Sequence, residues 1–139
     1  MTNETNPIKT ELFFFDALKK VSIDDKRKEL LISIAEFIAS EIKNSKVVNL
    51  NFICTHNSRR SQLAQVWAHY AIEYYKLKNI QSFSGGTETT AFHRNTVKTL
   101  QKVGFEFELT KVSHTNPHYK ITFEGVQQPI LGFSKIYDD

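Results

Sequence analysis

The stretch NFICTHNSRRSQLAQVWA, residues 51–68, places the only cysteine of the chain between a predicted strand and a predicted helix. An apolar run over residues 47–53 ends at Cys54, and a polar segment then leads into apolar residues at helical spacing. Arg60 follows the cysteine as a Cys-x5-Arg pattern, and Ser61 comes next. A lone cysteine after an apolar strand is most often a small buried hydrophobe, so any function of Cys54 depends on these neighbours.

The position of Cys54 favours a reactive thiolate over a buried thiol. In a parallel α/β sheet, ligands bind beyond the carboxyl ends of the strands. A helix that begins there offers unpaired N–H groups and a partial positive charge, which lower the pKa of a nearby cysteine. Ser61 can donate its hydroxyl to the sulfur, and the planar guanidinium of Arg60 suits two oxygens of a tetrahedral oxyanion. The residues therefore predict a thiolate placed for in-line attack on a bound phosphoryl group.

The pattern around the cysteine predicts a mixed α/β domain. Residues 61–78 have the pattern of a helix, residues 80–84 that of a strand, and residues 95–104 that of a helix stopped by Gly104. This β-α-β-α order predicts a parallel sheet with flanking helices and right-handed crossovers. Beyond Gly104 we expect extended segments and no further helix.

Two helices are predicted ahead of the cysteine strand. Residues 1–10 have the composition of a loose polar terminus, residues 11–21 can form a short helix, and residues 22–45 form the clearest helix, capped by Ser22 or Asp24. Apolar residues of this second helix recur at helical spacing: Leu30, Leu31, Ile34, Phe37, Ile38 and Ile42. We expect the stripe to face the core, and an oligomer interface is the alternative. The predicted domains are a helical extension, residues 1–46, and an α/β domain, residues 47–139.

Composition limits the classes of function. The 139 residues suit one globular domain, and a net charge of +3 lacks the dense positive field of a nucleic-acid binder. One cysteine excludes an internal disulfide and a cysteine-rich zinc site, and the five histidines show no metal-ligand spacing. No signal peptide or membrane span is visible. We therefore expect a cytoplasmic protein without a metal, a cofactor, or a nucleic-acid or membrane partner, and the sequence leaves its oligomeric state open.

The segment CTHNSRRSQLA, residues 54–64, resembles the phosphate-binding loop of the low-molecular-weight protein tyrosine phosphatases and of the thioredoxin-coupled arsenate reductases that share their fold. That loop commonly reads Cys-Thr-Gly-Asn-Ser-Cys-Arg-Ser and is followed by a helix. FSGGTET, residues 83–89, resembles the Ser-Ala-Gly-Thr-Glu segment after the second strand of this family. NTVKTLQKVGFE, residues 95–106, resembles the helix ending in glycine that follows. The resemblance covers about residues 47–107.

The resemblance implies a role for each residue of the loop. Cys54 would be the nucleophile that forms a phosphocysteine, Arg60 would clamp the phosphoryl oxygens, and Ser61 would stabilise the thiolate. Asn57 would hold the shape of the loop through a bond to Ser84, although Ser84 could also be an ordinary residue at the end of a strand. The backbone amides that would bind the phosphoryl oxygens belong to Thr55, His56, Asn57, Ser58, Arg59 and Arg60.

The chain departs from the pattern of the family at three places. His56 stands where the loop usually has glycine, and its imidazole could touch the ligand; histidine tolerates left-handed backbone better than most residues, at some strain. Arg59 stands where a second cysteine is common, and a simple surface arginine is an equal interpretation. The general acid of the family is an aspartate in a loop late in the chain, but after Cys54 the only aspartates here are Asp138 and Asp139.

The general acid is therefore not identified, and we expect only phosphate esters with good leaving groups to react. His56, the group of the loop that titrates near neutral pH, is the first residue to suspect if poor leaving groups also react. The remaining parallel strands of the family, in its C-terminal part, and the downstream cysteines of the reductases also have no counterpart. We therefore expect either an N-terminal portion of a longer protein or a divergent member.

Three functions are compatible with the resemblance. The first is phosphomonoester hydrolysis of the protein tyrosine phosphatase type, with a phosphate ester or a phosphotyrosine protein as substrate. The second is arsenate reduction, which with one cysteine would need an external thiol. The third is a non-catalytic module that binds oxyanions such as phosphate or arsenate. Phosphatase chemistry needs no second cysteine, so it is the first expectation.

Overall fold

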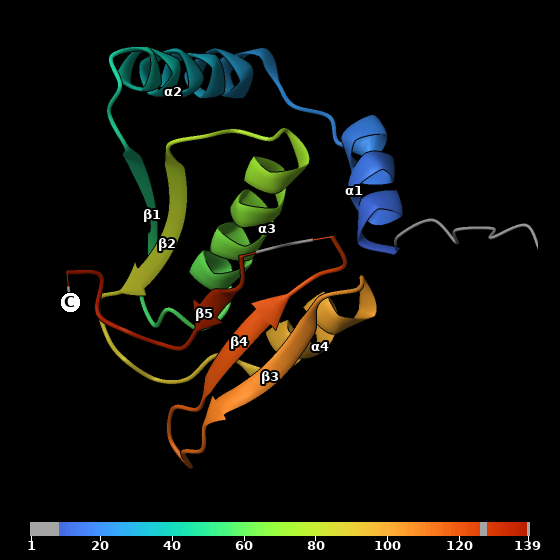
Figure 1. Ribbon diagram of the computed structural model, residues 1–139, viewed down its shortest axis with the longest axis vertical. Coiled ribbons are helices and arrows are strands. Elements are labelled where there is room, and N and C mark those ends of the chain that lie inside the picture. The colour runs from blue at the N-terminus through green and yellow to red at the C-terminus, as the bar shows by residue number, and fades with distance from the viewer. Residues whose placement is uncertain (1–8, 126–127, 139) are drawn as a thin grey trace, which may run out of the picture.

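The computed structural model describes residues 9–125 and 128–138, so most of the predicted loose terminus, residues 1–10, lies outside the described residues. Figure 1 shows one helix of the chain, α3, between a pair of strands and a second group of three strands. The elements in chain order are α1 (Lys9–Lys20), α2 (Asp25–Lys43), β1 (Val48–Cys54), α3 (Arg60–Tyr74), β2 (Ile80–Gly86), α4 (Arg94–Lys102), β3 (Glu106–Lys111), β4 (His118–Thr122) and β5 (Ile130–Gly132).

The β-α-β prediction around the cysteine is confirmed. β1 and β2 pair in parallel, from Val48 opposite Ile80 to Cys54 opposite Gly86, and α3 connects them. Residues beyond β5 extend this pair on its other side, because Gly86 forms an isolated parallel bridge with Ile136. The carboxyl ends of both strands and the N-terminus of α3 therefore meet at one edge, which is the lower end of the strand pair in Figure 1.

The prediction of one parallel sheet with flanking helices is only partly right. In the described ranges the parallel sheet has two strands, and β3, β4 and β5 form a separate antiparallel sheet in that order. The connection from β3 to β4 is the short segment 112–117. A parallel pairing needs a crossover of about a dozen residues or more, so a connection of this length permits only antiparallel neighbours.

The core lies between α3, α4 and the antiparallel sheet. Its buried apolar side chains are Val66, Tyr70, Phe92, Leu100, Phe105, Ile121 and Phe123. α1 adds to it, because the ring of Phe14 packs at 5.0 Å from the centroids of both Tyr70 and Tyr74. Thr10 is buried against Gly104, where a Cβ would collide with Thr10 Oγ1 and where the φ of 103° would strain any other residue. The predicted short helix of the N-terminal region is thus present and contacts the α/β part of the chain; the domain boundary at residue 46 stays a prediction.

The prediction that the second helix faces the core is wrong. Asp24 caps α2 as expected, accepting a hydrogen bond from Arg27 N at 2.8 Å, but no α2 side chain is buried. Phe37 is 65% exposed and Leu30 52% exposed. Figure 1 shows the reason: α2 lies at the amino-terminal end of β1 and β2, away from the core and from the cysteine loop. In the described ranges, no helix is long and apolar enough to cross a lipid bilayer.

Candidate active site

The cysteine loop is the turn between β1 and α3. Cys54 is the last residue of β1, residues 55–59 form the turn, and Arg60 is the first residue of α3. Asn57 holds the left-handed backbone of the turn, with φ of 47°, whereas His56 is not among the residues of positive φ. The strain expected at His56 is therefore absent, because the left-handed position falls on asparagine, which adopts it more readily than most residues.

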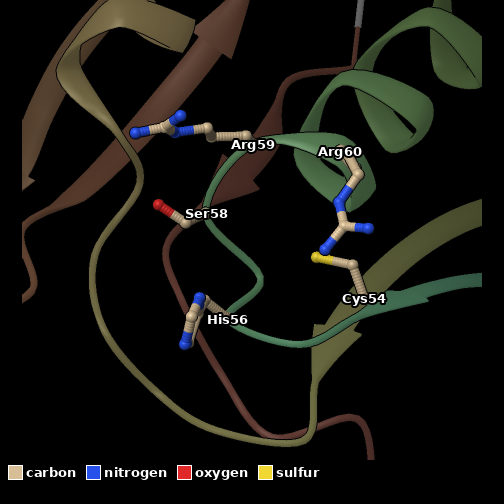
Figure 2. A pocket seen from close by; sticks show the side chains of 5 residues that line it. All are labelled: Cys54, His56, Ser58, Arg59 and Arg60. Carbon is tan, nitrogen blue, oxygen red and sulfur yellow. The ribbon is translucent and has the colours of Figure 1, made fainter.

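The loop encloses a cavity of about 300 Å³. Figure 2 shows the sulfur of Cys54 and the guanidinium of Arg60 on one side of the loop, with His56, Ser58 and Arg59 on the other. These five residues line the cavity. The other residues of the predicted site lie around it, since Asn57, Ser61 and Ser84 are buried behind the loop and Thr55 is exposed.

The thiol of Cys54 is poised to ionise near neutral pH. Partial burial raises its pKa, but hydrogen bonds from the Ser61 hydroxyl and from backbone N–H groups of Ser61, Asn57 and Ser58 outweigh burial and lower the pKa to about 7. The Ser61 hydroxyl lies 3.0 Å from the sulfur and already accepts from Asn57 Nδ2 at 2.8 Å, so its own proton is available to the thiolate. The expected low pKa therefore comes from donors of the loop and of the helix N-terminus.

Asn57 fixes the shape of the loop from its buried side. Its Nδ2 donates to Ser84 Oγ at 2.9 Å as well as to Ser61, so the expected contact between Asn57 and Ser84 is present. Its Oδ1 accepts from Gln62 Nε2 at 3.0 Å and from the backbone N of Lys135 at 3.1 Å. Because this side chain is fully buried and uses both its donor and its acceptor ends, it determines the path of the loop backbone.

Two buried glutamines of α3 were missed in the sequence. The periodicity of the helix comes from its apolar residues, but α3 also buries polar side chains, those of Ser61, Gln62 and Gln65. Gln62 donates to the carbonyl of Asn57 at 3.0 Å and to that of Phe133 at 2.9 Å. Gln65 donates to the carbonyl of Ser82 at 3.1 Å. The available signal was the spacing of Ser61, Gln62 and Gln65, which places three polar side chains on one side of a helix next to the loop.

The segment after β5 braces the loop and was also missed. Ser134 Oγ donates to the carbonyl of His56 at 2.7 Å, and Gly86 N donates to the carbonyl of Lys135 at 2.8 Å. The ammonium of Lys135 lies behind the loop, 3.3 Å from Asn57 Oδ1 and 3.4 Å from Ser84 Oγ. The loop therefore lies between β2 and the segment around Ser134 and Lys135, near the C-terminal end of the sequence.

Lys135 makes the stability of this arrangement depend on pH. Burial lowers the pKa of its ammonium to about 8, whereas an unfolded lysine titrates near ~10.4. Between these values the unfolded chain binds more protons than the folded chain, so the free energy of unfolding should rise as pH increases from about 8. The full rise is at most about 3 kcal/mol, because one pKa unit corresponds to about 1.4 kcal/mol.

We expect Lys135→Met to remove this rise. Urea midpoints measured between about pH 7 and 9.5 would show the loss as a shallower rise, because the Cys54 thiol, with a pKa of about 7 in the folded chain and ~8.5 in the unfolded chain, contributes a rise of its own that the variant keeps. Burial raises the pKa of Tyr70 to about 12, so the opposing contribution of Tyr70 begins only above that range. Lys98→Met, on the exposed side of α4, is the matched control and should keep the rise of the unchanged chain. Equal pH dependence in the Lys135 variant and in the unchanged chain would contradict the buried ammonium.

Two contacts lie at the rim of the cavity. His56 Nε2 is 3.2 Å from Glu88 Oε2, and Arg59 Nη2 is 2.9 Å from His93 Nε2. His93 Nδ1 also accepts from Asn95 N at 3.0 Å as the cap of α4, which leaves the proton of a neutral ring on Nε2. Nε2 then cannot accept from Arg59, so this contact does not hold the guanidinium in place.

The structure identifies no carboxylate as the missing acid. Among the residues that the structure describes, the cavity is lined by no aspartate or glutamate. Asp138 is exposed and does not reach the cavity, and Asp139 lies outside the described residues. Within the same ranges, no group of three histidine, cysteine or carboxylate side chains could hold a metal ion.

No protein-family model, curated protein or solved structure matches the chain. The chemistry of the cavity therefore rests on its own geometry: a thiol with a pKa near 7, backbone N–H groups aimed at it, and an arginine at the start of the following helix.

Proposed function

We propose that the chain is a cysteine-dependent phosphomonoesterase of the low-molecular-weight protein tyrosine phosphatase type, acting through a phosphocysteine. One observation carries the proposal: Cys54, with its lowered pKa, and Arg60 line the same cavity at the carboxyl end of a parallel β-α-β unit. A thiolate needs no further activation to attack phosphorus, and the cavity offers an adjacent cation for the phosphoryl oxygens.

Each residue of the loop has a separate role in this reaction. The Cys54 thiolate attacks phosphorus while Arg60 binds two equatorial oxygens and the loop amides bind the others. The S–P bond forms as the bond to the leaving oxygen breaks. Water then attacks the phosphocysteine, and the S–P bond breaks to return the electron pair to sulfur. Ser61 donates to the sulfur whenever it is anionic, before attack and after release.

The finer fold and the cellular setting belong to the same proposal. The loop between β1 and α3, and the Asn57–Ser84 bond that ties it to β2, support a phosphatase-like domain. After α4 the chain forms the antiparallel strands β3 to β5, where the resemblance implies further parallel strands. The proposed relationship therefore covers the β1-α3-β2-α4 region. A catalytic thiol requires reducing conditions, which supports a cytoplasmic location.

Turnover of p-nitrophenyl phosphate tests the function. We expect hydrolysis that phosphate and arsenate inhibit and that iodoacetamide abolishes by modifying Cys54, the only cysteine of the chain. Phosphate should protect the thiol from alkylation, because both compete for one cavity. Hydrolysis that survives complete alkylation would contradict the proposal. Protection without hydrolysis would leave only the oxyanion-binding module, and arsenate reduction with an added thiol in the same samples would instead favour the reductase.

A further inference from the structure

The proposed reaction lacks a proton donor for the leaving group. The side chains lining the cavity, in the described ranges, are Cys54, His56, Ser58, Arg59 and Arg60. Arginine stays protonated in proteins and serine does not ionise near neutral pH, so neither type can release a proton and take it back. Apart from the nucleophile, histidine is the only residue type of the five whose side chain can both donate and accept a proton near neutral pH.

The main chain of His56 is fixed on two sides. Its carbonyl accepts from Ser134 Oγ at 2.7 Å and from Thr90 Oγ1 at 3.4 Å. These contacts come from the segment after β5 and from the segment after β2. The position of His56 at the edge of the cavity is therefore set by tertiary contacts, although its side chain remains 53% exposed at the mouth.

Glu88 orients the imidazole of His56. Its carboxylate lies 3.2 Å from Nε2, which places a proton on that nitrogen. Nδ1 makes no hydrogen bond within the described part of the chain, so it is the nitrogen that can face a substrate. The other charged groups that share the cavity with the ring are Cys54, Arg59 and Arg60. Figure 2 shows the imidazole and the guanidinium of Arg60 on opposite sides of the loop.

We propose that His56 is the general acid and base of this site, with Glu88 as its positioning residue, which rests on the function proposed above. As the S–P bond forms, the bond from phosphorus to the leaving oxygen breaks and its electron pair takes the Nδ1 proton, which releases a neutral alcohol. The neutral ring then accepts a proton from the water that attacks the phosphocysteine. The S–P bond breaks, phosphate leaves, and the thiolate and the imidazolium are restored.

This assignment changes the expectation for substrates. Without an acid, only esters of acidic phenols would react, because their phenoxides leave without protonation. With His56 as donor, esters of weaker phenols also react, and the benefit of the donor grows as the leaving group becomes more basic. Dependence on the leaving group therefore separates a proton donor from a residue that merely binds phosphate.

The test compares His56→Asn with the unchanged chain on 2,4-dinitrophenyl phosphate and phenyl phosphate. The parameter is kcat/KM, because it reports the step that breaks the bond to the leaving oxygen. We expect kcat/KM for phenyl phosphate to fall by about 10²–10⁴-fold, and that for the dinitrophenyl ester by less than about threefold. His114→Asn, an exposed histidine in the turn between β3 and β4, should change neither value.

Two further measurements exclude a purely structural effect. Phosphate should protect Cys54 from alkylation equally in His56→Asn and the unchanged chain, which shows that the loop is intact. The pH profile of kcat/KM for phenyl phosphate should have a basic limb, because the donor must be protonated. Glu88→Gln, which removes the charge and keeps the size, should lower kcat/KM for phenyl phosphate and leave that for the dinitrophenyl ester unchanged, because only the orientation of the proton donor is affected. In His56→Asn the basic limb should disappear.

The outcomes separate this inference from the function beneath it. Equal losses on both esters, or no loss on either, would overturn the role of His56 while leaving the cysteine-dependent hydrolysis in place. A basic limb that persists unchanged in His56→Asn would overturn it as well. Absence of any hydrolysis that depends on Cys54 would remove the proposed function and the inference together.

Discussion

Replacing Cys54 with serine should abolish hydrolysis of p-nitrophenyl phosphate while leaving phosphate binding nearly intact. Serine keeps the shape of the side chain, but its hydroxyl does not ionise near neutral pH and is a far weaker nucleophile than the thiolate. Loss of a catalytic nucleophile lowers kcat by roughly 10³–10⁶-fold. Phosphate affinity should persist, because it depends on the loop amides and on Arg60. Steady-state kinetics and calorimetric titration with phosphate measure the two effects separately.

The pH dependence of alkylation tests separately whether the Cys54 thiol ionises near neutral pH. The unchanged chain should react with iodoacetamide along a curve with its midpoint near pH 7, the pKa of the Cys54 thiol. Ser61→Ala removes the hydroxyl 3.0 Å from the sulfur and should move the midpoint to higher pH. A midpoint in the usual range of free cysteine, about 8.5, in the unchanged chain would contradict the activated thiolate.

Replacing Arg60 with lysine should lower kcat by about 10²–10³-fold, the cost of removing one donor to a transition-state oxyanion. Lysine keeps the positive charge but loses the planar fork that binds two oxygens at once. During the attack, the charge on the equatorial oxygens is distributed in a plane. The planar fork therefore stabilises the transition state more than it stabilises bound phosphate. The loss should therefore appear mainly in kcat, with a smaller change in phosphate affinity.

Arg94→Lys is a matched control for this change. Arg60 and Arg94 are each the first residue of a helix, α3 and α4, and both are exposed, but only Arg60 lines the cavity. The Arg94 variant should keep the activity of the unchanged chain. If the two variants lose activity equally, the contribution of Arg60 is a general effect of surface charge and not a contact with the substrate.

Local sequence determined the region that carries the site. The apolar run, the polar turn and the helical periodicity around Cys54 predicted a strand, a loop and a helix, and the structure has β1, residues 55–59 and α3 there. The second strand and α4 were predicted for the same reason, since β-branched runs, glycine stops and helical spacing are signals within a few residues. The roles assigned to the loop residues remain predictions until activity is measured.

Local sequence did not determine what covers each element. The stripe of α2 was read correctly as one apolar face, but periodicity shows only which side chains share a face and not which surface lies opposite. In the structure that face remains exposed, with Phe37 at 65%. The antiparallel pairing of β3 to β5 was likewise open in the sequence, because the pattern of an extended segment identifies neither its partner strand nor the direction of pairing.

Only the tertiary structure decided the surroundings of the loop. Ser134 and Lys135 contact His56 and Asn57 across 78 positions of sequence, and Glu88 reaches His56 from the segment after β2. Ser134 and Lys135 stand in no motif, and although Glu88 belongs to the segment 83–89 that resembles the family, the sequence did not indicate its contact with His56. The sequence by itself determined which residues form the loop and which local groups donate to Cys54. The burial of Asn57 and the contact between His56 and Glu88 exist only once remote segments pack against the loop.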